Sequence, residues 1–150
     1  MSIRTIVKVW AILLLAVAVL FMGCGKKEEP KVQAPVQAPP PAPSVASMTF
    51  AKGVDVNWTA VTPTTEFKPS DRINVTIRTE NVVPGNTLLV RWMFLGTQQL
   101  VKADSVVLKE GGVNNSAFFI ERAKGFPLGE YRLVAFLNGM PVKTGGFMVK

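Results

Sequence analysis

Apolar and polar side chains alternate along much of the C-terminal part of the chain. Ile73, Val75 and Ile77 alternate with polar residues, and Val90 and Trp92 alternate in the same way further along. A period of two places the apolar side chains on one face of a β-strand and the polar ones on the other. The pattern therefore predicts strands that are buried on one face, and no segment has the period of about 3.6 residues that marks an amphipathic helix.

Turn signals rich in Gly, Pro and Asn separate these segments. Asn138-Gly139 is the strongest, because a two-residue type I′ turn needs positive φ at both positions, and it predicts a hairpin between the last two strands. Gly145-Gly146 predicts a bulge or bend within the last strand. We predict about seven strands in all: 54–60, 72–79, 87–95, 98–108, 115–121, 130–137 and 140–149.

Seven short antiparallel strands within residues 48–150 indicate one all-β domain, a sandwich of two sheets. Trp92 lies in the third predicted strand, and Gly129 and Tyr131 open the sixth. These positions resemble immunoglobulin-like (Ig-like) domains, which carry a core tryptophan in the third strand and a corner tyrosine in the sixth, with a cysteine two residues later. Leu133 replaces that cysteine, so the resemblance implies an Ig-like antiparallel β-sandwich without the inter-sheet disulfide.

A second likeness comes from the order of motifs along the whole domain. It is similar to small Ig-like domains of exported bacterial proteins, which implies the fold and an exported location but neither a ligand nor a reaction. The motifs are Phe67-x-Pro69-x-Asp71-x-Ile73, Trp92, Phe126-Pro127-x-Gly129-x-Tyr131, Leu137-Asn138-Gly139 and Phe147-x-Val149.

The N-terminal segment has a different pattern. Arg4 and Lys8 precede an apolar run, residues 9–22, and the only cysteine, Cys24, follows it. As a helix this run spans about 21 Å, whereas a hydrocarbon core is about 30 Å thick. The run therefore favours a secretory signal peptide. The alternative is an uncleaved anchor that leaves the domain on a transmembrane stem.

The end of this run resembles the cleavage site of bacterial lipoproteins, in which the cysteine receives a lipid and becomes the mature N-terminus. Gly23 and Cys24 match the family pattern, whereas Phe21 and Met22 are bulkier than its usual residues. The resemblance implies a signal peptide over residues 1–23 and lipid attachment at Cys24. The bulky pair leaves open whether the signal peptide is cleaved.

A single cysteine has no internal disulfide partner after export, and lipidation consumes its thiol. Two or more acyl chains, such as palmitate, give stable membrane anchoring. Residue 25 is Gly, whereas aspartate at this place tends to retain such lipoproteins at the inner membrane. The resemblance therefore favours the outer membrane, facing the periplasm, over the inner membrane, and a Gram-positive cell surface remains an alternative.

Residues 24–47 have the composition of a linker. Six of the 11 prolines lie here, and no hydrophobic period is present. Proline-rich chains are semi-rigid spacers that rise about 3.1 Å per residue. We interpret the segment as a tether. The alternative is that Pro40-Pro41-Ala42-Pro43 docks in a proline-binding groove.

Charge argues against a nucleic-acid partner. Residues 48–150 contain twelve Lys and Arg and eight Asp and Glu, a net charge of +4, and the cations are scattered along the chain. The chain has no histidine. This removes the commonest general base, the usual catalytic triads and the commonest ligand of zinc and copper.

Other routes to metal binding or catalysis are also weak, and we expect neither a cofactor nor a metal. Thioethers suit Cu(I), but the methionines have no close spacing and core packing explains them: Met48, Met93, Met140 and Met148. Paired-acid hydrolysis needs two carboxylates at one place. The candidate acids stand singly along the sequence: Asp55, Glu66, Asp71, Asp104, Glu110, Glu121 and Glu130. Asp71 is best explained as a turn-forming residue.

A few side chains are candidates for surface contacts. Trp58 stands between polar neighbours in the first predicted strand, where an exposed ring can stack on a sugar or anchor a protein. The alternative is that Trp58 closes the edge of the core. Arg91 and Arg132 are expected on outward strand faces, either solvated or facing acidic groups of a partner. Lys102 is expected to guard an edge strand against pairing.

The sequence thus favours a non-enzymatic envelope lipoprotein. We expect it to be held on the membrane by its lipid and to act through contact with an envelope protein, as an accessory or assembly component. The alternative is a module that binds envelope glycans with exposed aromatic residues, Trp58 first among them. The sequence does not identify the partner, the pathway or the oligomeric state.

Overall fold

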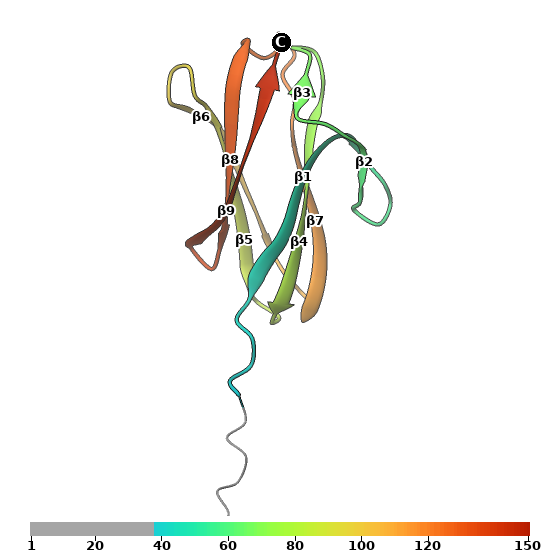
Figure 1. The fold of residues 1–150 in the computed structure, drawn as a ribbon, viewed down its shortest axis with the longest axis vertical. Coiled ribbons are helices and arrows are strands. Elements are labelled where there is room, and N and C mark those ends of the chain that lie inside the picture. The colour runs from blue at the N-terminus through green and yellow to red at the C-terminus, as the bar shows by residue number, and fades with distance from the viewer. Residues whose placement is uncertain (1–37) are drawn as a thin grey trace, which may run out of the picture. The chain divides into compact units, whose positions relative to one another are not determined.

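A computed structural model describes residues 38–150. The expected signal peptide, Cys24 and most of the expected linker lie outside the described residues. Every regular element in the described part is a β-strand (Figure 1). The strands are β1 (Ser44–Val54), β2 (Ala60–Pro63), β3 (Glu66–Phe67), β4 (Ile73–Val82), β5 (Thr87–Phe94), β6 (Gln99–Val107), β7 (Gly112–Ile120), β8 (Gly129–Leu137) and β9 (Met140–Val149).

The strands form two sheets that face each other (Figure 1). The four-stranded sheet has the order β2-β1-β4-β7, and the five-stranded sheet has the order β3-β9-β8-β5-β6. All neighbours are antiparallel except β3, which pairs in parallel with β9. After β1 and β2 in the four-stranded sheet, the chain therefore crosses to β3 at the edge of the five-stranded sheet. This topology confirms the expected all-β, Ig-like sandwich.

The inward faces of both sheets form one apolar core. Trp92 has no exposed surface, and Phe147 packs edge-on against it with ring centroids 6.0 Å apart. The opposite sheet contributes Phe50, whose ring centroid lies 5.1 Å from that of Phe147. Edge-to-face and offset packing of this kind suits the charge distribution of aromatic rings. The core position predicted for Trp92 is confirmed.

Tyr131 forms the corner that the resemblance implied. Its hydroxyl donates a hydrogen bond of 2.9 Å to the carbonyl oxygen of Pro127, four residues upstream. Burial raises the pKa of Tyr131, and the positive charge of Arg122 partly offsets this. The hydroxyl therefore keeps its proton, and with it the donor of this bond, across the physiological range. Leu133, which replaces the family's cysteine, is completely buried.

The first predicted strand, 54–60, is wrong. Val54 ends β1, and residues 55–59 form a tight turn before β2. The carboxylate of Asp55 accepts hydrogen bonds from the backbone N–H groups of Asn57 and Thr59, at 2.9 and 2.8 Å. Such a side-chain bond to nearby backbone favours a turn over an extended strand. Strand pairing instead starts at Ser44, inside the segment expected to be linker.

The last hairpin agrees with its prediction, apart from the bulge. Asn138 and Gly139 have φ of 51° and 83°, as a type I′ turn requires, and they join β8 to β9. The expected bulge at Gly145-Gly146 is wrong, because β9 runs through both residues in regular register with β8. The register shift lies nearer the turn, opposite the step from Ala135 to Phe136.

Gly145 is needed for the approach of the two sheets. Its missing side chain would point into the core, where a Cβ atom would lie 2.9 Å from both the sulfur of Met48 and a ring carbon of Phe50. Since Met48 and Phe50 belong to β1, this glycine lets β1 pass close over β9. A close approach of two strands explains the glycine better than a bulge does.

Candidate functional site

The outer face of the five-stranded sheet carries several partly exposed apolar side chains. Its centre is formed where β5 and β8 pair, because opposed residues of antiparallel strands share a face. The register pairs Leu89 with Phe136, Arg91 with Val134, and Met93 with Arg132. The two arginines are exposed, and the apolar four are partly exposed. We call these six residues the five-stranded face: Leu89, Arg91, Met93, Arg132, Val134 and Phe136.

The two arginines of the five-stranded face have no acidic partner within residues 38–150. The guanidinium carbon of Arg91 lies 5.1 Å from the centroid of the Phe136 ring, which is a cation–π distance. The outward positions expected for Arg91 and Arg132 are thus confirmed. They place two positive charges, neither of them in an ion pair within the described residues, beside an apolar surface.

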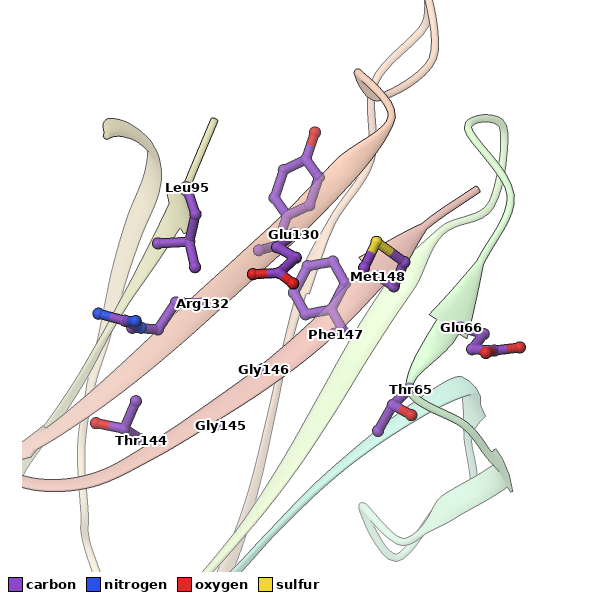
Figure 2. Close-up of a pocket in the computed structure, with 11 residues that line it drawn as sticks. Thr65, Glu66, Leu95, Glu130, Arg132, Thr144, Gly145, Gly146, Phe147 and Met148 are labelled. Atoms are coloured by element: carbon purple, nitrogen blue, oxygen red, sulfur yellow. The ribbon is translucent and has the colours of Figure 1, made fainter. Parts of the chain in front are cut away.

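A hollow of about 450 Å³ adjoins this face (Figure 2). Figure 2 shows Leu95 and Arg132 on one side of it, Thr65 and Glu66 on the other, and Gly146 along β9. A Cβ atom at Gly146 would approach nothing closer than the carbonyl oxygen of Tyr131, at 3.5 Å. The missing side chain therefore opens part of this hollow to solvent.

The hollow brings together two acids that the sequence left apart. Glu66 and Glu130 both line it. The carboxylate of Glu66 forms an ion pair with Lys150 at 2.6 Å. Figure 2 shows the side chains of Glu66 and Glu130 pointing in different directions. The two carboxylates therefore do not converge on one point, as attack on a bond between them would require.

Trp58 lies on the other side of the molecule, in the turn between β1 and β2. It is 56% exposed and has a positive φ of 59°. The interpretation that it closes the edge of the core is therefore wrong. Its backbone N–H donates to the carbonyl oxygen of Asp55 at 3.1 Å, inside the turn that the Asp55 carboxylate braces. Figure 1 shows this hairpin projecting from the side of the four-stranded sheet.

A groove of about 600 Å³ extends from Trp58 across the outer face of the four-stranded sheet. The guanidinium carbon of Arg72 stacks 3.6 Å from the centroid of the Phe119 ring. Phe119 is outward because Phe118, its neighbour in β7, faces the core. We call this the Trp58 groove, and the residues that matter here are Lys52, Asp55, Trp58, Arg72, Asn74 and Phe119.

Sequence reasoning missed Arg72 and Phe119 as partners of Trp58. The pair Phe118-Phe119 held a usable signal, because adjacent residues of a strand face opposite sides and one of the two rings had to be outside. Nothing in the sequence showed that the β1–β2 turn lies near this ring.

Lys102, which lies in β6, covers part of the edge of β7 in the other sheet instead of the edge of its own strand. Its ammonium nitrogen donates to the carbonyl oxygen of Phe119 at 3.1 Å and forms an ion pair with Asp104 at 2.7 Å. β6 and β7 are the outer strands of their sheets. Lys102 thus connects one edge of the sandwich across to the other.

Within residues 38–150, no three or more Cys, Asp or Glu side chains gather where they could hold a metal ion. The same part of the chain contains no helix with the length and apolar character needed to cross a membrane.

No family model matches the sequence, and no curated protein matches it. An immunoglobulin-like protein from Pseudomonas aeruginosa is similar in structure, with a TM-score of 0.46 and 15% identity, over 75% of this chain and 99% of that one. The alkylpurine DNA glycosylase AlkC from Pseudomonas fluorescens, bound to DNA containing an abasic site analogue, has a TM-score of 0.46 and 13% identity, over 72% of this chain. The match spans only 30% of the glycosylase. The fold assignment therefore rests on the sheet order of this chain itself.

Proposed function

We propose that this chain is a non-enzymatic, lipid-anchored envelope module that binds another protein through the five-stranded face. Cys24 carries the lipid, and the outer membrane, facing the periplasm, is the proposed location. The observation that supports protein binding is the combination of four partly exposed apolar side chains with Arg91 and Arg132, which lack acidic partners within the described residues. Apolar centres with arginine are typical of protein interfaces.

The proposed partner has an apolar surface flanked by carboxylates. Apolar burial stabilises a complex because it removes apolar surface from water. Carboxylates on the partner would pair with Arg91 and Arg132 in a shielded site, where ion pairing fixes register. A second copy of the chain fits less well, because a two-fold contact centred on Arg91 would bring like charges together.

The proposed tether suits this role. Strand pairing begins at Ser44, so residues 25–43 remain as spacer between the lipid and the domain. At about 3.1 Å per residue they reach about 60 Å when extended. The domain could then contact partners up to that distance from the membrane, and the tether would keep its local concentration at the surface high.

Site-specific photo-cross-linking tests the proposal in cells that express the full chain. A photoreactive residue at position 89, within the five-stranded face, should give one discrete cross-linked product. The matched control is position 78, which is exposed on the four-stranded sheet and should give none. Arg91→Glu should reduce the product from position 89, whereas Arg91→Lys should retain most of it.

Equal products from positions 89 and 78, or no product from position 89, would overturn the proposed docking face. A product of twice the mass of the chain would identify a second copy as the occupant and overturn the choice of partner. Insensitivity to Arg91→Glu would remove the carboxylate requirement.

A second candidate function is binding of envelope glycans at the Trp58 groove. The observation that favours it is the 56% exposure of Trp58 on a turn that is braced by Asp55. Pull-down of the full chain with envelope glycans should give a saturable signal that Trp58→Ala abolishes. A signal that survives this substitution, or no signal with the native chain, would exclude the groove as a glycan site.

A further inference from the structure

The Trp58 groove contains a cation that nothing in the described chain neutralises. Arg72 forms no ion pair within residues 38–150, whereas the two neighbouring lysines do. Lys52 pairs with Asp71 at 3.3 Å, and Lys102 pairs with Asp104 at 2.7 Å. An arginine with no acidic partner, at the rim of a concave site, suits an anion better than a neutral ligand.

The acid that lines the groove is already engaged. One carboxylate oxygen of Asp55 accepts hydrogen bonds from the backbone N–H groups of Asn57 and Thr59. Its hydrogen bonds serve the turn that presents Trp58. Two cations, Lys52 and Arg72, line the groove against the single negative charge of Asp55, so the lining keeps a net positive charge.

The position of Arg72 also leaves the N–H groups of its guanidinium available to a ligand. The guanidinium is stacked on the Phe119 ring, 3.6 Å from the centroid, and stacking uses the face of the group and not its edge. No described residue accepts a hydrogen bond from its side chain. The N–H groups along its edge form a planar fork that matches two oxygens of a carboxylate or a phosphate.

The remaining groups suit a sugar ring. Trp58 offers an exposed indole with an apolar face and one N–H donor, and the C–H side of a pyranose stacks on such a face. The Asn74 side-chain nitrogen donates to the carbonyl oxygen of Lys52 at 3.0 Å. No described residue donates to the Asn74 amide oxygen, which is left as an acceptor for a hydroxyl group.

We propose that the Trp58 groove binds a saccharide that carries a carboxylate or phosphate group. Trp58 stacks on the sugar ring, and Arg72 forms an ion pair with the acidic group. The amide oxygen of Asn74 accepts a hydrogen bond from a sugar hydroxyl group. This inference rests on the second candidate function and adds the chemical class of its ligand.

Titration calorimetry on the detergent-solubilised full chain tests it with three probes. The probes are an oligogalacturonate, its methyl ester of the same length, and glucose 6-phosphate. The native chain should bind the acidic oligomer, and binding should weaken as salt is raised. Arg72→Gln removes the charged hydrogen bond to the acidic group. This variant should bind the acidic oligomer about tenfold more weakly or worse, and it should bind the methyl ester with the same affinity as the native chain.

The matched control is Arg78→Gln, which removes an exposed arginine from the same outer face of β4 but outside the groove. It should bind all probes as the native chain does. Trp58→Ala should weaken binding of the acid and of the ester alike, and an unchanged melting temperature would show that the domain still folds. Binding of glucose 6-phosphate, with or without the oligomer, would identify which acidic group the site accepts.

The outcomes separate this inference from the function on which it rests. Equal affinity of the acid and the ester, lost on Trp58→Ala and unmoved by Arg72→Gln, overturns the acidic class and leaves glycan binding standing. No binding of any probe at millimolar concentration overturns both.

Discussion

The rings of Tyr131 and Phe147 lie nearly parallel, with centroids 5.1 Å apart and 11° between their planes. The two residues are direct cross-strand partners in β8 and β9. The stack therefore orients Tyr131 so that its hydroxyl reaches the carbonyl oxygen of Pro127. Ring packing and the corner hydrogen bond thus stabilise the same segment, the start of β8.

The corner bond and the stack are separable by mutation. Tyr131→Phe removes only the bond to Pro127 and should lower the free energy of unfolding by about 1 kcal/mol. Phe147→Ala removes a ring packed against several others and should cost about 3–5 kcal/mol. Urea denaturation measures both. Equal losses from the two substitutions would mean that the hydroxyl, and not the ring, holds the corner.

Trp92 provides a second test of the core. Trp92→Ala should cost about 3–5 kcal/mol, because the side chain is fully buried. The indole N–H is buried with no hydrogen-bond partner, so Trp92→Phe removes an unsatisfied donor along with some packing area. Trp92→Phe should therefore be far milder than Trp92→Ala. A loss below about 1 kcal/mol for Trp92→Ala would contradict the core packing.

The adjacent glycines of β9 should respond in opposite ways. Gly145→Ala places a Cβ atom 2.9 Å from Met48 and Phe50, and such overpacking should cost about 1–3 kcal/mol. Gly146→Ala points outward without a clash and should be neutral or stabilising by up to about 1 kcal/mol. Thermal melting of the two variants compares them directly. A tolerated alanine at 145 would show that β1 can move away from β9.

Asp71 predicts a pH dependence of stability. The backbone N–H of Lys68 donates to its carboxylate at 2.9 Å and lowers its pKa, and the Lys52 ammonium lowers it further. Because the folded pKa is below the unfolded value of about 3.9, the stabilisation is complete at neutral pH. It is lost as the pH falls from about 4 through the folded pKa.

The corresponding variant is Asp71→Asn. It should be less stable than the native chain by about 1 kcal/mol at pH 7, since hydrogen bonds to the charged carboxylate are weakened. The difference should shrink in acid, where the native carboxyl is protonated too. Free energies of unfolding measured at pH 7 and near pH 3 provide the comparison. A difference of the same size at both would mean that the charge of Asp71 does not contribute.

The proposed lipid anchor has its own test. Cys24→Ser in the full chain should move the protein from the membrane fraction to the soluble periplasmic fraction, or leave an unprocessed precursor. Mass spectrometry of the native protein should show the added acyl chains. Unchanged membrane partition together with unchanged mass in the variant would rule out lipidation at this residue.

Alternation of side chains was sufficient to locate β4, β5 and β8, because each has one face in the core, and the Asn138-Gly139 turn located β9. Alternation was insufficient for β1, where the register with β4 shifts between Val45 and Ser47 and breaks the period of two. It also missed the two residues of β3, since so short a pairing has no period. The turn at Trp58 depends on hydrogen bonds to Asp55 that strand propensity does not represent.

The candidate sites were harder to foresee than the fold. The outward-facing positions of Arg91 and Arg132 were predicted from the alternation alone. The Trp58 groove was not predicted, because it joins residues near positions 55, 72 and 119 that become neighbours only through the sheet order β1-β4-β7. Alternation indicates which residues face outward, but it does not indicate which outward-facing residues lie close together in the folded domain.

The hydrogen bond from Lys102 to Phe119 has a consequence for crowded molecules. A strand from a neighbouring molecule that approached β7 would have to displace this ammonium group before it could pair with the backbone there. Pairing of neighbouring molecules through that edge, which would extend the sheet from one molecule into the next, is thus discouraged.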